Sequence, residues 1–234
     1  PSRDAIRGII SAFAAFPDVN GLEGRLLADG IGDGGIPVLD AGEMILEFEE
    51  TTGNAAPSLD IIRDNLISLY GCNMAYRASA LGEMRFDENL PLYAWQEDVD
   101  FSYRLPGRLI KTRALTGVHC GTRSGRETKG HLLGYSQIAN PIYLMRKGSM
   151  PRGFALELMA RNVMANHLRM LKPEPWVNRR GRAWGNWLAV LDLLRGRAEP
   201  DRILELAEPK AAHTRPAIPR QRSLRAQKGP KPQD

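Results

Sequence analysis

The apolar residues in the first part of the chain change their spacing several times, and each spacing predicts a different element. Ile6, Ile9 and Phe13 recur at helical intervals after Ser2, a residue type that caps helix N-termini. A second serine, Ser58, is suited to cap a later helix. In chain order, the pattern predicts a helix over 2–15, a strand over 19–28, a strand over 43–50 and a short helix over 58–67.

The middle of the chain alternates between short apolar runs and turn residues. Residues 69–76 form a strand-like apolar run that passes through Gly71. An acidic cluster at 97–100 leads into apolar residues at helical spacing, which predicts a helix with an acidic first turn. A strand is expected over 109–119, with His119 at its end.

From Gln137 onward the pattern turns helical, with predicted helices over 154–171 and 183–195. The second of these carries one apolar stripe, and such a stripe usually packs into a core. Two tryptophans and flanking arginines keep a membrane-lying face open as the alternative. The stripe consists of Trp184, Trp187, Leu188, Leu191 and Leu194.

The basic character of the chain is confined to its end. The formal net charge is +5, yet residues 208–234 hold seven of the 32 basic residues and only two of the 27 acidic ones. The 25 basic and 25 acidic residues of 1–207 cancel, so nucleic acid is not an expected partner. Residues 208–234 also hold five prolines and few large apolar residues, and we expect this tail to be disordered.

The two cysteines, Cys72 and Cys120, show no metal-binding or redox spacing, so we expect buried free thiols in a reducing compartment. No apolar run is long enough to cross a bilayer, and the sequence shows no signal peptide. These features predict a cytoplasmic protein, with the inner face of the membrane as the alternative location.

The acidic cluster Glu97-Asp98-Val99-Asp100 is the strongest candidate for chemistry. At about 100° per residue, Glu97 and Asp100 share a helix side, whereas Asp98 and Asp100 point about 200° apart. This D-x-D spacing therefore cannot close on one metal ion within a helix. Carboxylates in a first helical turn suit the helix dipole, which helps to keep them ionised, as a general base requires. Ordinary N-terminal helix charge without chemistry is the alternative interpretation.

Three linked motifs follow one another between residues 71 and 104. They are Gly71-x-Asn73-Met74-Ala75-x-Arg77, Phe86-Asp87-Glu88-x-Leu90-Pro91 and Trp95-x-Glu97-Asp98-Val99-Asp100-x-x-x-Arg104. The series resembles the acceptor half of a family 2 glycosyltransferase, a family with the nucleotide-diphospho-sugar transferase (GT-A) fold. Because several motifs occur in order, the resemblance is specific for the family, but it does not identify the substrate.

The resemblance implies roles for five residues of this stretch. Asp98 would be the base that deprotonates the acceptor hydroxyl, with Glu97 beside it binding the acceptor. Gly71 and Asn73 would lie on the strand under the sugar, and Trp95 would offer a flat face for stacking.

The resemblance also implies a site for the leaving diphosphate. His119 would be a metal ligand or contact the diphosphate, and the metal would be Mg²⁺ or Mn²⁺. Ser124 and Arg126, in the polar loop that follows, would close over the leaving group, since arginine donates a fork of N–H bonds to phosphate oxygens. A structural histidine and a solvated loop remain the alternatives.

In the resembled family a donor-binding half with a metal-holding D-x-D motif comes first, and residue 1 corresponds to the position just after it. We therefore expect an N-terminally incomplete domain without a complete metal site of its own. The predicted class is α/β, with a partial GT-A (Rossmann-like) sheet and flanking helices, a helical segment and a disordered basic tail. The expected divisions are an acceptor half over 1–135, a helical region over 136–207 and the tail over 208–234.

The expected function is transfer of a sugar, with inversion, from a nucleotide-diphospho-sugar donor to a hydroxyl of a carbohydrate or lipid-linked acceptor, as in polysaccharide biosynthesis. Peripheral membrane association is a further expectation. Two rival functions remain: a non-catalytic transferase remnant that binds a partner through its basic tail, and a glycoside hydrolase, which also uses two carboxylates. A hydrolase needs two acids across a cleft, and adjacent Glu97 and Asp98 diverge too much to face each other.

Overall fold

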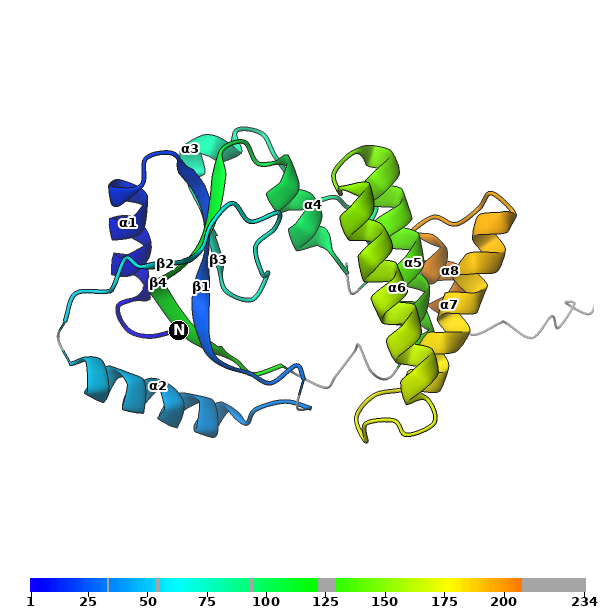
Figure 1. The fold of residues 1–234 in the computed structure, drawn as a ribbon, viewed down its shortest axis with the longest axis horizontal. Helices are drawn as coiled ribbons and strands as arrows, with labels where there is room; N and C mark the ends of the chain where they lie inside the picture. Colours follow the sequence, from blue (N-terminus) through cyan, green and yellow to red (C-terminus); the bar gives the residue numbers. More distant parts are fainter. Residues whose placement is uncertain (33, 54, 93–94, 122–128, 208–234) are drawn as a thin grey trace, which may run out of the picture.

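The molecule has two parts that lie side by side (Figure 1). A small sheet with its flanking helices forms the first part, and a group of helices from the later chain forms the second. The predicted tail over 208–234 lies outside the described residues. The computed structural model describes residues 1–32, 34–53, 55–92, 95–121 and 129–207.

A four-stranded sheet with strand order β2-β4-β1-β3 forms the centre of the first part. β1 and β4 run parallel, while the short strands β2 and β3 pair antiparallel with β4 and β1. An open mixed sheet with flanking helices is an α/β fold, consistent with a partial Rossmann-like sheet. The strands are β1 (Val19–Asp29), β2 (Ile61–Arg63), β3 (Met74–Tyr76) and β4 (Arg108–His119).

The predicted N-terminal helix forms as α1 (Ala5–Ala15) and packs closely on β4. A side-chain carbon on Gly8 would lie 1.7 Å from the carbonyl oxygen of Ala114, so only glycine permits this approach. The apolar side chains of α1, β1 and β4 close into one core. Its buried members are Ala5, Ala12, Val19, Leu22, Ile110, Ala114 and Leu115.

The strand predicted over 43–50 was wrong, because this segment belongs to the helix α2 (Val38–Thr52). Met44, Ile45 and Leu46 form a short apolar run like that of a strand, but the buried Ala41 and the half-buried Phe48 lie two helical turns apart on one face. The guanidinium of Arg25 lies 5.6 Å from the centre of the Phe48 ring, which holds this face against β1.

The helix predicted over 58–67 was also wrong, because residues 61–63 of this segment form the strand β2 and none of the segment is helical. Ser58 caps no helix there. Its hydroxyl oxygen accepts the Asp60 N–H at 3.2 Å within a turn. Ile61 then pairs with Thr112 of β4, so pairing along the sheet prevails over the local helical spacing.

Two further boundaries differ from the prediction. Ser2 does not cap α1, because the helix begins at Ala5 and Asp4 occupies the N-cap position. The Ser2 N–H instead donates to the Thr116 carbonyl of β4 at 2.9 Å. The run over 69–76 pairs only at its end, as β3, since a turn closed by the Asn73 N–H precedes it. The one-turn helix α3 (Ala78–Leu81) follows β3.

The second part contains α5 (Gly130–Lys147), α6 (Arg152–Arg169), α7 (Arg179–Leu194) and the short α8 (Arg202–Ala207). The helices predicted over 154–171 and 183–195 are thereby confirmed, with shifted ends. α5 and α7 cross at close range, since a side-chain carbon on Gly134 or Gly185 would lie 2.0 Å from a carbonyl oxygen of the facing helix. The predicted division between 135 and 136 falls inside α5.

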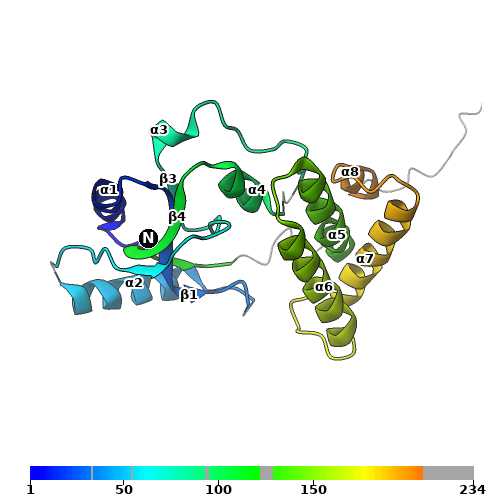
Figure 2. The same cartoon turned by 45° about the horizontal axis from the view of Figure 1, so that its top comes forward.

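The helix α4 (Glu97–Arg104) connects the two parts through a buried carboxylate, and Figure 2 shows it between the sheet and α5. Asp100 is fully buried and accepts hydrogen bonds from Arg104 at 2.8 Å and from Lys147 of α5 at 2.7 Å. The Lys147 ammonium also lies 2.6 Å from Asp87. One lysine of α5 thus binds two carboxylates of the first part, which fixes α4 on α5.

The apolar stripe of α7 does not pack into the core, contrary to the prediction. Trp184, Trp187, Leu191 and Leu194 are exposed, and only Leu188 of the stripe is partly buried. The close crossing with α5 admits small side chains, so α7 turns its opposite face inward. The residues it buries are Arg182, Ala183, Gly185, Asn186, Ala189 and Asp192.

Both cysteines are free, as predicted. Cys72 is exposed, however, because it lies in the turn before β3, and Cys120 is half-buried at the end of β4. Within the part of the chain that the structure describes, no helix has the length and hydrophobicity that spanning a bilayer requires.

Candidate functional site

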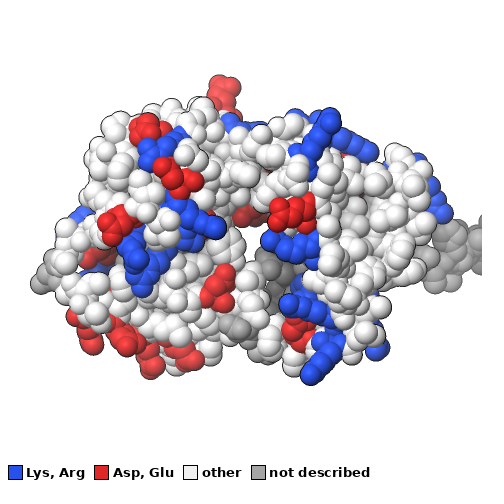
Figure 3. All heavy atoms as spheres, in the orientation of Figure 1, with Lys and Arg blue, Asp and Glu red and all other residues white. Residues whose placement is uncertain are grey.

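A cleft of about 660 Å³ lies where the sheet, α4 and α6 meet. Figure 3 shows the surface hollowed between the two parts of the molecule. The turn over 68–72 and the first turn of α4 form one wall, and α6 forms the other. Its lining includes the polar residues Glu23, Tyr70, Trp95, Glu97, Asp98, His119, Arg161 and Asn162.

A second cavity, of about 360 Å³, lies between residues 2–4, α2, residues 55–60 and β4. Its carboxylates are engaged with a neighbouring cation: Arg3 lies 3.9 Å from Asp4 and 3.8 Å from Glu49. We therefore place the candidate chemistry in the larger cleft, where Glu97 and Asp98 line the wall and form no ion pair in the part of the chain that the structure describes.

Asp98 is held at the cleft by two backbone N–H groups. One carboxylate oxygen accepts the Gly71 N–H at 3.0 Å, and the other accepts the Val99 N–H at 2.8 Å. Because each carboxylate oxygen has two lone pairs, both oxygens keep capacity for a further hydrogen bond. The side chain is thus fixed in position and can still accept a proton.

Gly71 gives Asp98 the space for this arrangement. A side-chain carbon at Gly71 would lie 3.1 Å from a carboxylate oxygen of Asp98 and 3.4 Å from its Cβ. Such an approach is tighter than ordinary van der Waals contact, so Asp98 would have to move. The predicted role of Gly71 under a sugar stays a prediction, but its contact with Asp98 is direct.

Burial raises the pKa of both carboxyl groups at the cleft. Desolvation, with a smaller contribution from the charge of Asp98, raises the pKa of Glu97 from 4.5 to about 7. Desolvation also raises the pKa of Asp98, against the opposing hydrogen bonds from Gly71 and Val99. The sequence predicted that the helix N-terminus would keep these groups ionised, and here burial outweighs that effect.

The two aspartates of the D-x-D spacing serve different purposes, as the helical angle predicted. Asp98 faces the cleft, whereas Asp100 is bound by Arg104 and Lys147 in the interior. Asp100 therefore contributes to the attachment of α4, and Asp98 and Glu97 are the carboxylates available to a ligand.

His119 lies at the edge of the sheet where the parallel strands end. It is the register partner of Asp29, and its Nδ1 lies 2.8 Å from the Asp29 carboxylate. The Tyr70 hydroxyl lies 3.3 Å from the same nitrogen. In open α/β sheets, ligands bind outside the carboxyl ends of parallel strands, and this edge opens into the cleft.

The metal implied by the resemblance requires several ligands. The Nδ1 atom of His119 contacts the Asp29 carboxylate, and a histidine held in this way can bind a metal through its Nε2 atom. Among the described residues, however, no three His, Cys, Asp or Glu side chains form a group that could hold an ion. These residues alone do not fit Mg²⁺ or Mn²⁺, so we route no step through a metal, and the ligand role of His119 stays a prediction.

The other predicted site residues lie in different surroundings. Trp95 lines the cleft, and its carbonyl accepts the Asn140 side-chain amide at 2.8 Å. Asn73 is buried and donates to the Arg25 carbonyl at 3.2 Å, so its amide holds β1 and is not part of the cleft lining. Ser124 and Arg126 lie outside the described residues.

The sequence analysis missed the wall that α6 contributes. Phe154 and Leu158 give this wall apolar surface, and Arg161 and Asn162 give it polar groups. No local signal marks these residues, because they reach the cleft only through the packing of α6 on α5 and α4.

Glu23 was also missed, although a signal existed. It is a charged residue of β1 next to the fully buried Leu22, and it is nearly buried beneath the cleft. Its carboxylate accepts the Tyr70 N–H at 3.0 Å and pairs with Lys111 at 2.5 Å. Glu23 therefore holds the turn that carries Gly71 in place.

Comparison of the chain with family models, with curated proteins and with solved structures yields no match in any of the three. No relative therefore shows the family or the activity. The function has to be inferred from the cleft and from the series of motifs that surrounds it.

Proposed function

We propose that the cleft is the acceptor side of an inverting glycosyltransferase with a GT-A-type sheet. The observation that carries the proposal is the position of Asp98. Its side chain lines a cleft of about 660 Å³, and two backbone N–H groups fix its carboxylate. The linked motifs between 71 and 104, which resemble those of family 2 glycosyltransferases, support the same assignment.

In this mechanism Asp98 is the general base. A hydroxyl of the acceptor sugar gives its proton to the carboxylate as its oxygen attacks the anomeric carbon of the donor. A new C–O bond forms on one face of that carbon while the bond to the diphosphate oxygen breaks on the other, so configuration inverts. The nucleoside diphosphate departs with the electron pair. A raised pKa makes Asp98 a stronger base than an exposed aspartate.

Glu97 binds the acceptor in this proposal. Because its pKa is about 7, the carboxyl group is protonated in a substantial fraction of molecules near neutral pH. A protonated carboxyl donates one hydrogen bond and accepts others, which suits the hydroxyls of a sugar. The two neighbouring carboxyl groups thus take different tasks, base and hydrogen-bond partner.

The remaining lining fits a carbohydrate ring. Trp95 supplies a flat aromatic surface, and the opposite wall offers Phe154 and Asn162. Apolar surface against a ring face with polar groups at its edges is the usual composition of small-molecule sites.

The negative charge that develops on the diphosphate needs stabilisation as the bond between the donor sugar and the diphosphate breaks. Ser124 and Arg126 remain our candidates for this task within the chain, with His119 at the cleft edge. The resemblance implies that a donor-binding half with its Mg²⁺ or Mn²⁺ completes the site. The rival function, a non-catalytic remnant acting through its tail, rests on residues 208–234, which are not described.

The test is transfer of radiolabelled sugar from a panel of nucleotide-diphospho-sugars, using the protein as its gene encodes it and a membrane extract as acceptor. Asp98→Asn should lower turnover by about 10²–10⁴-fold, the range for loss of a general base. The matched control is Asp40→Asn, which removes an exposed carboxylate of α2. Undiminished turnover in Asp98→Asn, with wild-type folding, would contradict the base assignment.

A further inference from the structure

The outer face of α7 combines aromatic, aliphatic and basic side chains in one stripe. Trp184 is 59% exposed, Trp187 56% and Leu194 79%. At helical spacing these residues share one side with an exposed leucine and two exposed arginines. We call this the tryptophan face, formed by Arg180, Trp184, Trp187, Leu191, Leu194 and Arg195.

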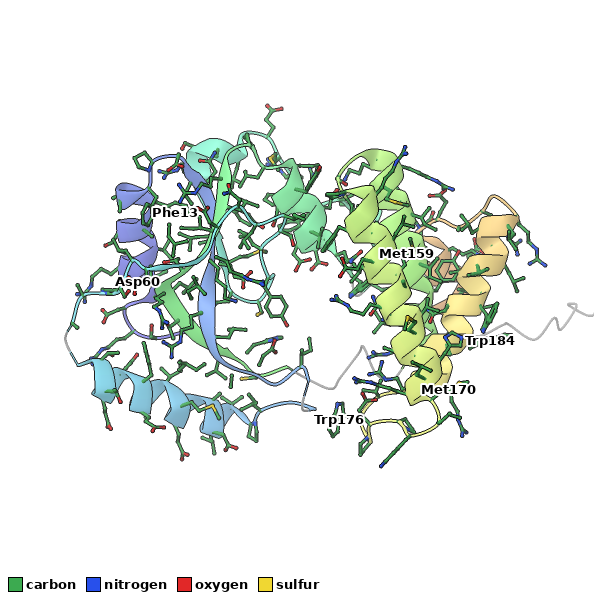
Figure 4. The ribbon with its side chains drawn as sticks, in the orientation of Figure 1. Phe13, Asp60, Met159, Met170, Trp176 and Trp184 are labelled. Carbon is green, nitrogen blue, oxygen red and sulfur yellow. The ribbon has the colours of Figure 1, made fainter. Side chains whose placement is uncertain are left out.

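The face continues onto α6, so it is wider than one helix. The rings of His167 and Trp187 meet edge to face at 5.9 Å, which places the two exposed surfaces side by side. Met164 and Leu168 of α6 and Leu171 just after it add exposed apolar surface, with exposed fractions of 60%, 67% and 86%. Figure 4 shows Trp184 on the side of α7 that faces away from the sheet.

The charges around this face are arranged for an anionic partner. Arg180 and Arg195 lie at the two ends of the stripe, in the first turn of α7 and directly after its last residue. α2 lies at the other end of the molecule, where Figure 3 shows acidic side chains gathered. Its exposed acidic residues are Asp40, Glu43, Glu47 and Glu50. A negatively charged surface would therefore attract the α7 end and repel the α2 end.

We propose that the tryptophan face docks the protein on an anionic lipid bilayer. Tryptophan is suited to the headgroup region because its ring is apolar and its N–H is polar. Exposed leucines reach toward the acyl boundary while arginines stay among the phosphates, as on interfacial helices. This docking is independent of the proposed transferase activity.

A second copy of the chain is a poorer occupant of the same face. In a two-fold symmetric contact the same surface meets itself. Antiparallel pairing of two α7 helices would bring Arg180 of one copy beside Arg195 of the other. Like charges would then meet at both ends of the contact, whereas lipid phosphates would pair with both arginines.

The experiment is vesicle flotation with the whole chain. Vesicles contain equal parts phosphatidylcholine and phosphatidylglycerol, or phosphatidylcholine alone. The variants are Trp184→Ser with Trp187→Ser, and Arg180→Glu with Arg195→Glu. The matched control is Leu39→Ser with Leu46→Ser, which removes exposed leucines of α2. Every variant keeps residues 208–234, so any contribution of the basic tail is common to all of them.

We expect binding to the anionic vesicles and a loss of about tenfold or more in each α7 variant, with binding unchanged in the α2 control. Circular dichroism verifies that the variants fold. Equal flotation of the Trp184→Ser, Trp187→Ser variant and wild type, or equal binding to neutral vesicles, would overturn the proposal. So would a dimer in the absence of lipid that the same double variant abolishes.

Discussion

The carboxyl group of Glu97 provides a test of the cleft that needs no substrate. Its pKa is about 7 in the folded chain, against an ordinary 4.5, chiefly because burial disfavours the charged form. The change Glu97→Gln keeps the shape of the side chain and removes the titration. The difference in unfolding free energy between this variant and wild type should therefore depend on pH.

The direction follows from the raised pKa. Below about pH 4.5 Glu97 is protonated in both the folded and the unfolded chain, and the stabilisation from its neutral form is fully present. As pH rises through about 7, the unfolded chain has already ionised and this stabilisation is lost. Each pKa unit is worth about 1.4 kcal/mol, so the full difference corresponds to about 3 kcal/mol. Since the side chain is partly exposed, solvent screening reduces the expected change to about 1.5 kcal/mol.

The assay is urea unfolding of the whole chain at about pH 5 and about pH 8. Between these conditions Glu97→Gln should gain about 1.5 kcal/mol relative to wild type. The matched control is Glu43→Gln, which removes an exposed carboxylate of α2. If the Glu97→Gln difference stays constant with pH, or changes no more than that of the control, the cleft does not desolvate this carboxyl group and our reasoning is wrong.

Two further predictions concern the residues that hold Asp98 and α4. Gly71→Ala should displace the Asp98 carboxylate, because the added carbon would lie 3.1 Å from its oxygen, and should lower sugar transfer about tenfold. Its control, Gly42→Ala, adds a carbon in open space on α2, and equal activity of the two variants would refute the contact. Lys147→Met should lower the unfolding free energy by about 2 kcal/mol, since it leaves the buried Asp100 with Arg104 alone. A loss below about 0.5 kcal/mol in chemical denaturation would show that the Lys147 contacts contribute little.

The sequence predicted the elements whose hydrophobic period is long and consistent. α1, α6 and α7 follow a helical period, and β1 and β4 are long strands of 11 and 12 residues. The errors fell on segments where the local pattern is ambiguous. Residues 43–50 hold a short apolar run that also fits a strand, and within 58–67 only residues 61–63 form a strand, by pairing with β4.

The tryptophan stripe shows a second limit of sequence analysis. The spacing of Trp184 and Trp187 indicated a shared face, and this was right. The spacing alone could not indicate whether this face packs into the core or stays exposed. The close crossing of α7 with α5 depends on Gly134 and Gly185. Because of this crossing, α7 faces the core with its small residues and leaves the tryptophan stripe exposed.

The candidate site was predictable on one wall only. Glu97 and Asp98 stand out as carboxylates opening a helix, and the structure brings them together with Trp95 and His119 at one cleft. The opposite wall, including Arg161, comes from a helix more than fifty positions later in the sequence, and only tertiary packing brings it there.

The pH dependence of sugar transfer tests the role of Asp98 most directly. A base must be deprotonated to act, so the rate at low substrate should rise with pH through the apparent pKa values of the Asp98 and Glu97 pair. Because burial raises the pKa of Asp98, the midpoint should lie above 3.8 and should move when Glu97 is replaced by Gln. A rate that stays constant down to about pH 4, or an acidic limb that persists unchanged in Asp98→Asn, would contradict the assignment of Asp98 as the base.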